Sequence, residues 1–244
     1  MVMAFRFKWV PFAATVLLVA LGVSLGRWQD RRAADKSAAE ARLQAGQAGA
    51  PLLLGAAAVP AAEVAQVEFR RVRVTGRFVA DWPLYLDNRP SAKGVGFYLL
   101  MPFRIDGSDQ HVLVARGWLP RNSAMREQLP PYGTPSGTVT LEGVARLHAG
   151  HVMQLGTAPP LKPGAIVQNA GVAEVAAASG LRMQPFIIEQ TAPAGAEDSG
   201  LSHDWPAPAS GVDKHRGYAF QWYALAVMAA LFFVATGFRR GKQN

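Results

Sequence analysis

The sequence predicts an α+β membrane protein in which a two-helix transmembrane hairpin brackets one mainly antiparallel β domain with one or two short helices. The first observation is a pair of uncharged apolar segments, one near each end of the chain. The second is a set of segments between them in which apolar and polar residues alternate, the pattern of half-buried strands. The third is charge, because all 17 acidic residues lie between Arg27 and Arg216. A length of 244 residues suits one domain with such appendages.

The first apolar segment, residues 9–26, is uncharged between Lys8 and Arg27. Its length is near the minimum of about 17–20 residues that crosses the hydrocarbon core of a bilayer. A cleaved signal peptide is the alternative, since the residues before it are basic. However, the apolar run exceeds a typical signal sequence, and no clean A-x-A cleavage site follows. We therefore expect an uncleaved transmembrane helix.

The second apolar segment, residues 217–238, is uncharged and long enough to span a membrane comfortably. The short tail after it is purely basic, which favours a cytoplasmic C-terminus. Because long loops are translocated largely regardless of charge, we expect both termini in the cytoplasm and the large loop on the other side. Aromatic residues stand near the span ends, where such rings prefer the headgroup region: Trp9, Trp28, Tyr218, Trp222 and Tyr223.

The region between the spans begins with a charged, Ala-rich stretch, from Arg27 to about Gln44, that predicts a helix continuing out of the membrane. About six or seven strands are predicted after it from their alternation. A helix is expected from near Asn169 to Gly180, because glycine is a common helix stop. The resulting map is 1–8 cytoplasmic tail, 9–26 transmembrane helix, 27–66 juxtamembrane helix and Ala/Gly-rich linker, 67–192 β-rich domain, 193–216 Pro/Ala/Gly/Ser-rich loop, 217–238 transmembrane helix and 239–244 cytoplasmic tail.

The composition excludes several classes of chemistry. The absence of cysteine removes disulfides, thiolate metal sites and cysteine nucleophiles. Residues 22–26 match the G-x-S-x-G pattern of serine hydrolases, but they lie in the first span and not at a strand-to-helix elbow. The region from Arg27 to Arg216 holds 20 basic and 17 acidic residues, a net charge of only +3, so we expect no nucleic-acid partner. We also expect no enzymatic activity.

Four histidines and one row of arginines offer weaker signals. His148 and His151, with Met153 nearby, could form a copper site, although exposed loop histidines are the favoured interpretation. His111 and His203 look isolated, and we expect both at the surface. One face of a predicted strand carries a row of arginines, which is either a solvated face or a docking surface for an acidic partner: Arg71, Arg73 and Arg77. For Arg116, structural ion pairing is the default interpretation.

His215 stands at the start of the second span, where an ionisable side chain is a candidate functional residue. On a helix His215, Tyr218 and Trp222 would share one stripe. A lipophilic porphyrin could place its iron on His215 and its ring against Trp222. Nearby basic residues could hold its propionates: Arg27, Arg31 and Arg216. The alternative is that these side chains only anchor the helix at the membrane surface.

Six segments, taken in order, resemble the Surfeit locus protein 1 family: "LGRWQDRRAADK", "FRRVRVTGRF", "LDNR", "GFYLLMPF", "VLVARGWLPR" and "KHRGYAFQWYALA". The resemblance runs from about Leu25 to Leu225 and depends on the order of the segments between two spans. Members of this family are membrane-anchored assembly factors of haem–copper cytochrome c oxidase. The resemblance therefore implies a protein of the bacterial inner membrane with its large domain in the periplasm.

The resemblance also implies a role in maturing oxidase subunit I at the stage of haem a insertion. His215 matches a histidine that is thought to ligate haem a in some bacterial members, and Trp222 matches a family tryptophan. Arg116 and Trp118 match a family R-G-W segment, and we take them as further docking candidates. The expected partners are subunit I, haem a synthase and membrane lipid. A scaffold that stabilises subunit I without binding haem is the main alternative, and a membrane-tethered hydrolase is a weaker one.

Overall fold

The computed structural model describes residues 3–5, 7–122, 124–125, 128–154, 156–206 and 211–240, with the backbone alone at 3–5 and 238–240. The chain divides into two compact units. One unit combines residues 1–41 with residues 208–244, and the other comprises residues 42–207.

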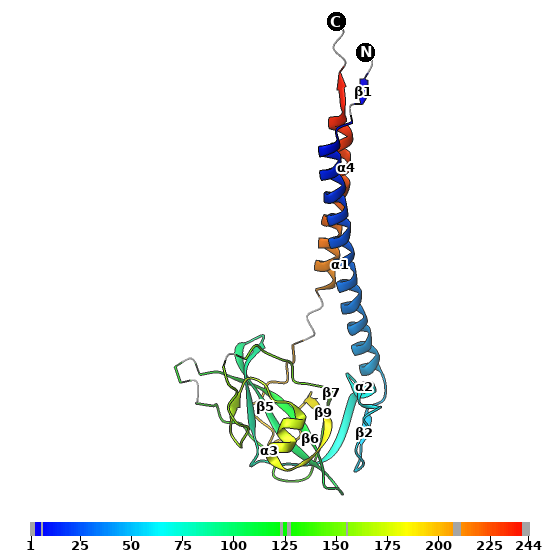
Figure 1. The fold of residues 1–244 in the computed structure, drawn as a ribbon. Helices are drawn as coiled ribbons and strands as arrows, with labels where there is room; N and C mark the ends of the chain where they lie inside the picture. The colour runs from blue at the N-terminus through cyan, green and yellow to red at the C-terminus, as the bar shows by residue number, and fades with distance from the viewer. Residues whose placement is uncertain are drawn as a thin grey trace. The chain divides into compact units, whose positions relative to one another are not determined.

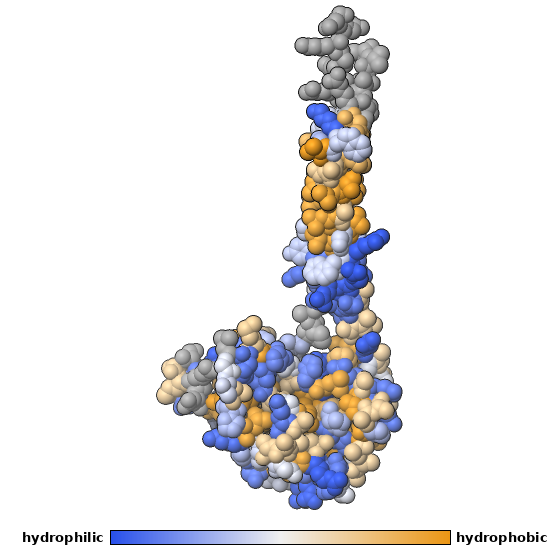
Figure 2. Space-filling view, viewed as in Figure 1, coloured by the Kyte–Doolittle hydropathy of each residue, from blue (hydrophilic) through white to orange (hydrophobic). Residues whose placement is uncertain are grey.

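The first unit is a pair of long helices, α1 (Trp9–Ala48) and α4 (Val212–Gly237), which lie side by side in Figure 1. Both are long and apolar enough to cross a membrane. Figure 2 shows a hydrophobic band along the pair with hydrophilic residues on either side of it. Strands β1 (Met3–Phe5) and β10 (Phe238–Arg240) pair antiparallel at one end. These features confirm the predicted hairpin.

The two helices approach closely because small residues line their contact. Gly22 and Gly26 of α1 are buried against α4. A Cβ atom at Gly22 would lie 2.9 Å from the carbonyl oxygen of Trp222, and one at Gly26 would overlap the ring of Tyr223. Side chains of this size are what helix pairs in membranes use to bring their backbones together.

Two helix limits differ from the sequence prediction. Residues 45–48, which we expected in the linker, belong to α1, so the helix does continue well beyond the first apolar segment. Residues 212–216, which we expected in the loop, are the first turn of α4. Their Pro/Gly-rich neighbours suggested a loop, but nothing in residues 212–216 prevents a helix, and the His215 N–H already donates to the Gly211 carbonyl.

The second unit is built on an eight-stranded sheet in the order β2-β3-β7-β9-β6-β5-β4-β8, within the described ranges. An additional pairing of β3 with β5 closes β3, β7, β9, β6 and β5 into a ring (Figure 1). The strands are β2 (Leu52–Leu54), β3 (Arg71–Phe78), β4 (Leu84–Ser91), β5 (Gly94–Ile105), β6 (Gln110–Pro120), β7 (Val139–Arg146), β8 (Ile166–Val167) and β9 (Arg182–Gln190).

Most neighbouring strands are antiparallel, as predicted, but β2–β3, β4–β8 and β6–β9 are parallel pairs. The two shortest strands, β2 and β8, were not predicted because three and two residues are too few for alternation to show. Strand β3 alternates as expected. Val72, Val74 and Phe78 are buried in the core of the ring, and the arginines between them are exposed.

Two short helices complete this unit, α2 (Val64–Val67) and α3 (Val172–Ser179). The predicted stop of α3 is confirmed, because Gly180 has a left-handed φ of 71° and donates its N–H to Ala176. The helix begins three residues after Asn169, whose amide instead makes two hydrogen bonds with the backbone of Val152. Asn169 therefore closes a loop, and the carboxylate of Glu174 accepts the N–H of Gly171 at the helix start.

Candidate functional site

The candidate site lies where α1 and α4 leave the apolar band of the helix pair. His215 stands in the first turn of α4 and is partly buried. Its Nδ1 lies 2.6 Å from Oε1 of Gln29 on α1. Gln29 is 9% exposed, so water has little access to this contact. An amide oxygen only accepts hydrogen bonds, so Nδ1 of the imidazole is the donor. In the neutral ring, Nε2 then carries the free lone pair.

A second hydrogen bond joins the same helices nearby. The hydroxyl of Tyr223 donates to Oδ2 of Asp30 at 2.7 Å, and its ring packs on Gly26. Asp30 is next to Gln29 in the chain, so two adjacent α1 residues each bond to a different α4 side chain. These contacts hold the register of the helix pair at the level of His215.

An apolar groove of ≈ 380 Å³ begins two helical turns from His215. Trp222 lies seven residues along α4 from His215, which places it on nearly the same stripe and roughly 10 Å further along the axis. The groove is lined by Leu18, Leu21, Gly22, Trp222, Leu225, Met228, Ala229 and Phe232. An imidazole at the edge of the apolar band is thus followed by an indole and a hydrophobic groove.

The other residues predicted for this site are exposed but not all on this face. Arg216 directly follows His215 on α4, and Tyr218 lies three residues after His215. Both side chains are exposed. Arg27 and Arg31 are exposed on α1. Each is two residues from Gln29, and two residues turn an α-helix by roughly 200°. Their Cα atoms therefore lie on nearly the opposite side of α1 from the face that meets His215.

Gln29 was missed by sequence reasoning, although a signal was present. Gly22, Gly26 and Ala33 are buried along one side of α1, and Gln29 falls in the same row with a helical spacing. A polar residue within a row of small buried residues indicates a hydrogen bond across the helix contact. The partner of that bond could not be named without the structure.

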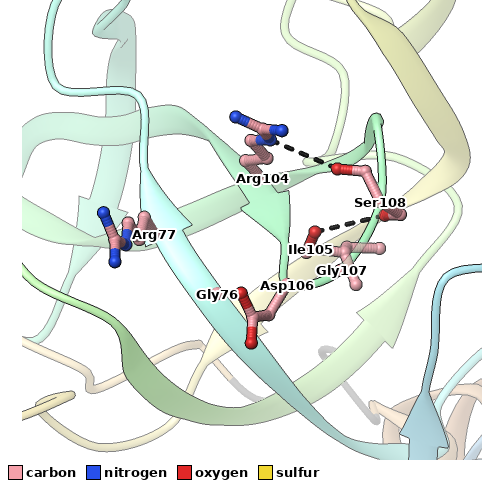
Figure 3. Close-up of a pocket in the computed structure, with 7 residues that line it drawn as sticks. All are labelled: Gly76, Arg77, Arg104, Ile105, Asp106, Gly107 and Ser108. Atoms are coloured by element: carbon pink, nitrogen blue, oxygen red, sulfur yellow. Dashed lines mark hydrogen bonds between the residues drawn. The ribbon is translucent and has the colours of Figure 1, made fainter.

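The arginine row on β3 forms a second candidate surface. Arg73 is paired with Glu142, and Nε of Arg77 donates to Thr138 at 2.8 Å. In the β3–β5 register, Arg77 lies opposite Arg104, an unfavourable arrangement of like charges. Figure 3 shows both arginines at a pocket of ≈ 340 Å³, with the carboxylate of Asp106 at its other end. This pocket is lined by Gly76, Arg77, Arg104, Ile105, Asp106, Gly107 and Ser108.

The chain was compared with models of known protein families. Residues 16–227 match the family model described as "SURF1 family", which is the Surfeit locus protein 1 family. The chain belongs to the SURF1 family. The match covers most of the chain, including most of α1, the first part of α4 and the strands between them, and it confirms the resemblance of the six sequence segments.

Relatives named "SURF1-like protein" occur in distant organisms. One from Monosiga brevicollis is 33% identical over 138 residues, which is 50% of this chain and 49% of the relative. One from Rickettsia bellii is 33% identical over 102 residues, 39% of this chain and 38% of the relative. One from Drosophila melanogaster is 28% identical over 156 residues, 57% of this chain and 51% of the relative. The chain thus spans about half or less of the length of these relatives.

The R-G-W segment of this SURF1 family chain does not lie at the surface. Arg116 is 0% exposed, and its guanidinium donates to Asp198 at 2.6 Å, to Thr134 at 2.6 Å and to the Gly133 carbonyl at 2.8 Å. Burial lowers the pKa of Arg116, and the adjacent Asp198 carboxylate opposes that effect.

Trp118 is 3% exposed, and its indole N–H donates to the Arg89 carbonyl. The docking roles expected for Arg116 and Trp118 are therefore wrong. Both side chains are used inside the β domain, where segments outside the strands, which carry Gly133 and Asp198, contact Arg116. The default interpretation of Arg116 as a structural ion pair is confirmed.

Of the four remaining histidines, His148 and His151 are exposed, and the other two are at least partly buried. His111 is 8% exposed, contrary to our expectation, because β6 is flanked by strands on both sides, and burial lowers its pKa. His203 is partly buried, with its pKa also lowered by burial. Nδ1 of His148 accepts the N–H of Gly150 in a loop. In the part of the chain that the structure describes, no group of three or more His, Cys, Asp or Glu residues could hold a metal ion.

Proposed function

We propose that the chain is an assembly factor for haem–copper cytochrome c oxidase that binds haem a at the membrane boundary and assists its insertion into subunit I. The observation that carries this proposal is the hydrogen bond between His215 Nδ1 and Gln29 Oε1. It leaves Nε2 as the nitrogen that can ligate iron. Histidines that bind metals usually donate their other ring N–H to an oxygen acceptor in the same way.

The residues at this site fit a haem as cargo. Imidazole is a common axial ligand of haem iron. The groove that begins at Trp222 is lined almost entirely by apolar side chains, which suits a porphyrin with a hydrophobic substituent. Arg216, exposed beside His215, is the cation best placed for a propionate. Arg27 and Arg31 are weaker candidates for that role because they start from the far side of α1.

In this proposal the protein makes and breaks no covalent bond. His215 ligates the iron, Trp222 covers part of the ring, and the close helix contact at Gly22 and Gly26 keeps the two helices in register. The site is open along its edge, so the cargo can arrive from one membrane partner and leave to another. The partners that suit such transfer are haem a synthase and subunit I, within the lipid of the bacterial inner membrane.

The test is a visible absorption spectrum of the full chain purified from cells that make haem a. We expect haem a to co-purify with the wild-type chain and with the His148→Ala control, which alters an exposed loop histidine. The His215→Ala chain should lose the haem and fail to support oxidase assembly. Absence of haem from the wild-type chain would contradict the proposal.

A scaffold that holds subunit I without binding haem is the second candidate function. The observation that favours it is that Arg77 and Arg104 are opposite each other in the β3–β5 register and line one pocket, where two cations suit an acidic partner. For this function, a chain with Arg77→Ala and Arg104→Ala should fail to support assembly while the His215→Ala chain succeeds. The opposite pattern supports haem transfer.

A further inference from the structure

We propose that Gln29 is a positioning residue that holds His215 in the tautomer protonated on Nδ1 and thereby keeps Nε2 available as a ligand. The inference rests on the proposed haem-binding function, which it deepens by naming the residue that prepares the ligand. It is carried by the contact of 2.6 Å between Gln29 Oε1 and His215 Nδ1. Gln29 would act through His215 and would not touch the iron.

The chemistry of the two groups determines the tautomer. A neutral imidazole carries one proton, which can reside on either ring nitrogen. When the nitrogen that faces an amide oxygen is Nδ1, only the Nδ1–H form makes a hydrogen bond there. The Nε2–H form would place two lone pairs against each other and would also block the ligating nitrogen.

Burial makes the contact stronger than a similar contact at a surface. Gln29 is 9% exposed and lies in the row with Gly22, Gly26 and Ala33 that packs against α4. A buried amide without a partner is costly, and at this place water cannot readily replace the histidine. The pairing is therefore mutual, because His215 satisfies the Gln29 oxygen and Gln29 orients the ring.

The Tyr223–Asp30 hydrogen bond is a second polar contact between the two helices, and it does not involve Gln29. The glycine contacts and this second bond maintain the helix pair when Gln29 is replaced by an apolar side chain of similar length. Gln29→Leu therefore removes the acceptor while keeping the packing. Gln29→Glu keeps an acceptor oxygen, and Gln44→Leu is a matched control at an exposed glutamine of the same helix.

The first arm of the experiment uses the full chain without haem, in lipid nanodiscs, with ¹⁵N-labelled histidine and at a pH where the imidazole is neutral. The His215 signals are assigned by their loss in His215→Ala. We expect protonated Nδ1 and unprotonated Nε2 in the wild-type, Gln44→Leu and Gln29→Glu chains. In Gln29→Leu the two tautomers should be mixed. An unchanged tautomer in Gln29→Leu overturns the inference.

The second arm measures haem a affinity and the reduction potential of the bound haem. Loss of an outer-sphere partner typically costs about 10–100-fold in metal affinity, so we expect Gln29→Leu to bind haem that much more weakly. Gln29→Glu should bind haem with a lower potential, because a carboxylate makes the imidazole a stronger electron donor.

The two arms separate the inference from the proposed function. Tautomer control by Gln29 in a chain that binds no haem would overturn the proposed function and leave the role of Gln29 toward His215 intact. Haem bound through His215 with equal affinity and potential in all the Gln29 variants would support the function and overturn the positioning role.

Discussion

The ion pair of Arg116 with Asp198 offers a quantitative test of how the β domain is stabilised. Asp198→Ala removes the carboxylate from a guanidinium that is fully buried. It also removes the acceptor for the Ala194 N–H and the Gln190 side chain. Leaving one member of a buried pair without its partner costs about 3–5 kcal/mol. Two buried donors also lose their acceptor, so we expect a value in the upper part of that range.

The matched control is Glu142→Ala, which breaks the Arg73–Glu142 pair on the surface of the same domain. The Arg73 and Glu142 side chains are 48% and 43% exposed, so water screens the pair. Exposed pairs contribute about 0–1 kcal/mol. The two substitutions thus remove a carboxylate from an arginine in environments that differ chiefly in burial.

The assay is thermal unfolding of the full chain in detergent, followed by tryptophan fluorescence. Trp205 reports on this region because its indole N–H donates to the Gln190 carbonyl at 2.6 Å. A loss of 1 kcal/mol lowers the midpoint by roughly 2–4 °C for a domain of this size. The upper part of the range, about 4–5 kcal/mol, corresponds to a fall of roughly 8–20 °C for Asp198→Ala. Glu142→Ala should lower the midpoint by no more than roughly 4 °C.

A third variant separates lost charge from lost packing. Arg116→Met combined with Asp198→Leu removes both charges and should recover most of the stability lost in Asp198→Ala, since apolar replacements of buried pairs are often neutral or better. If Asp198→Ala lowers the midpoint no more than Glu142→Ala does, the reasoning from burial is refuted.

Two further predictions concern pH and topology. Burial lowers the pKa of His111 below its ordinary value of 6.5, so its contribution to stability is present above that value and is lost as the pH falls below it. The unfolding midpoint of the wild-type chain should fall on acidification. The fall should be smaller in His111→Gln, whereas the exposed-loop control His148→Gln should show the same fall as the wild-type chain. Equal falls in all three chains would contradict this prediction. The chain has no cysteine, so Lys8→Cys and Ser108→Cys each introduce a single thiol. A membrane-impermeant maleimide added to cells with a permeabilised outer membrane should label Ser108→Cys alone, and the reverse pattern would show that the proposed orientation is wrong.

Local patterns in the sequence predicted the elements whose stability depends on their own residues. The two apolar segments predicted the long helices, because the length of an uncharged run is itself the physical requirement for crossing a bilayer. The alternation along β3 predicted which of its side chains are buried. Gly180 predicted the end of α3, since a left-handed residue at that point favours glycine.

Contacts between distant segments could not be predicted in the same way. The closure of the ring depends on Gly76, Arg77 and Phe78 of β3 pairing with β5, and no residue in either strand specifies that partner. The sequence around Arg116 does not indicate whether its side chain is exposed or buried. Its burial depends on distant segments, among them the one that carries Asp198, 82 positions away.

The candidate site shows the same division. The sequence by itself determined that a histidine stands where a membrane helix begins, with a tryptophan two turns further along the same stripe. Only the tertiary structure decided which ring nitrogen is free, because that depends on Gln29, 186 positions away on the other helix. Hydropathy and helical period are properties of one segment, whereas a tautomer is set by whichever group packing brings within hydrogen-bonding distance.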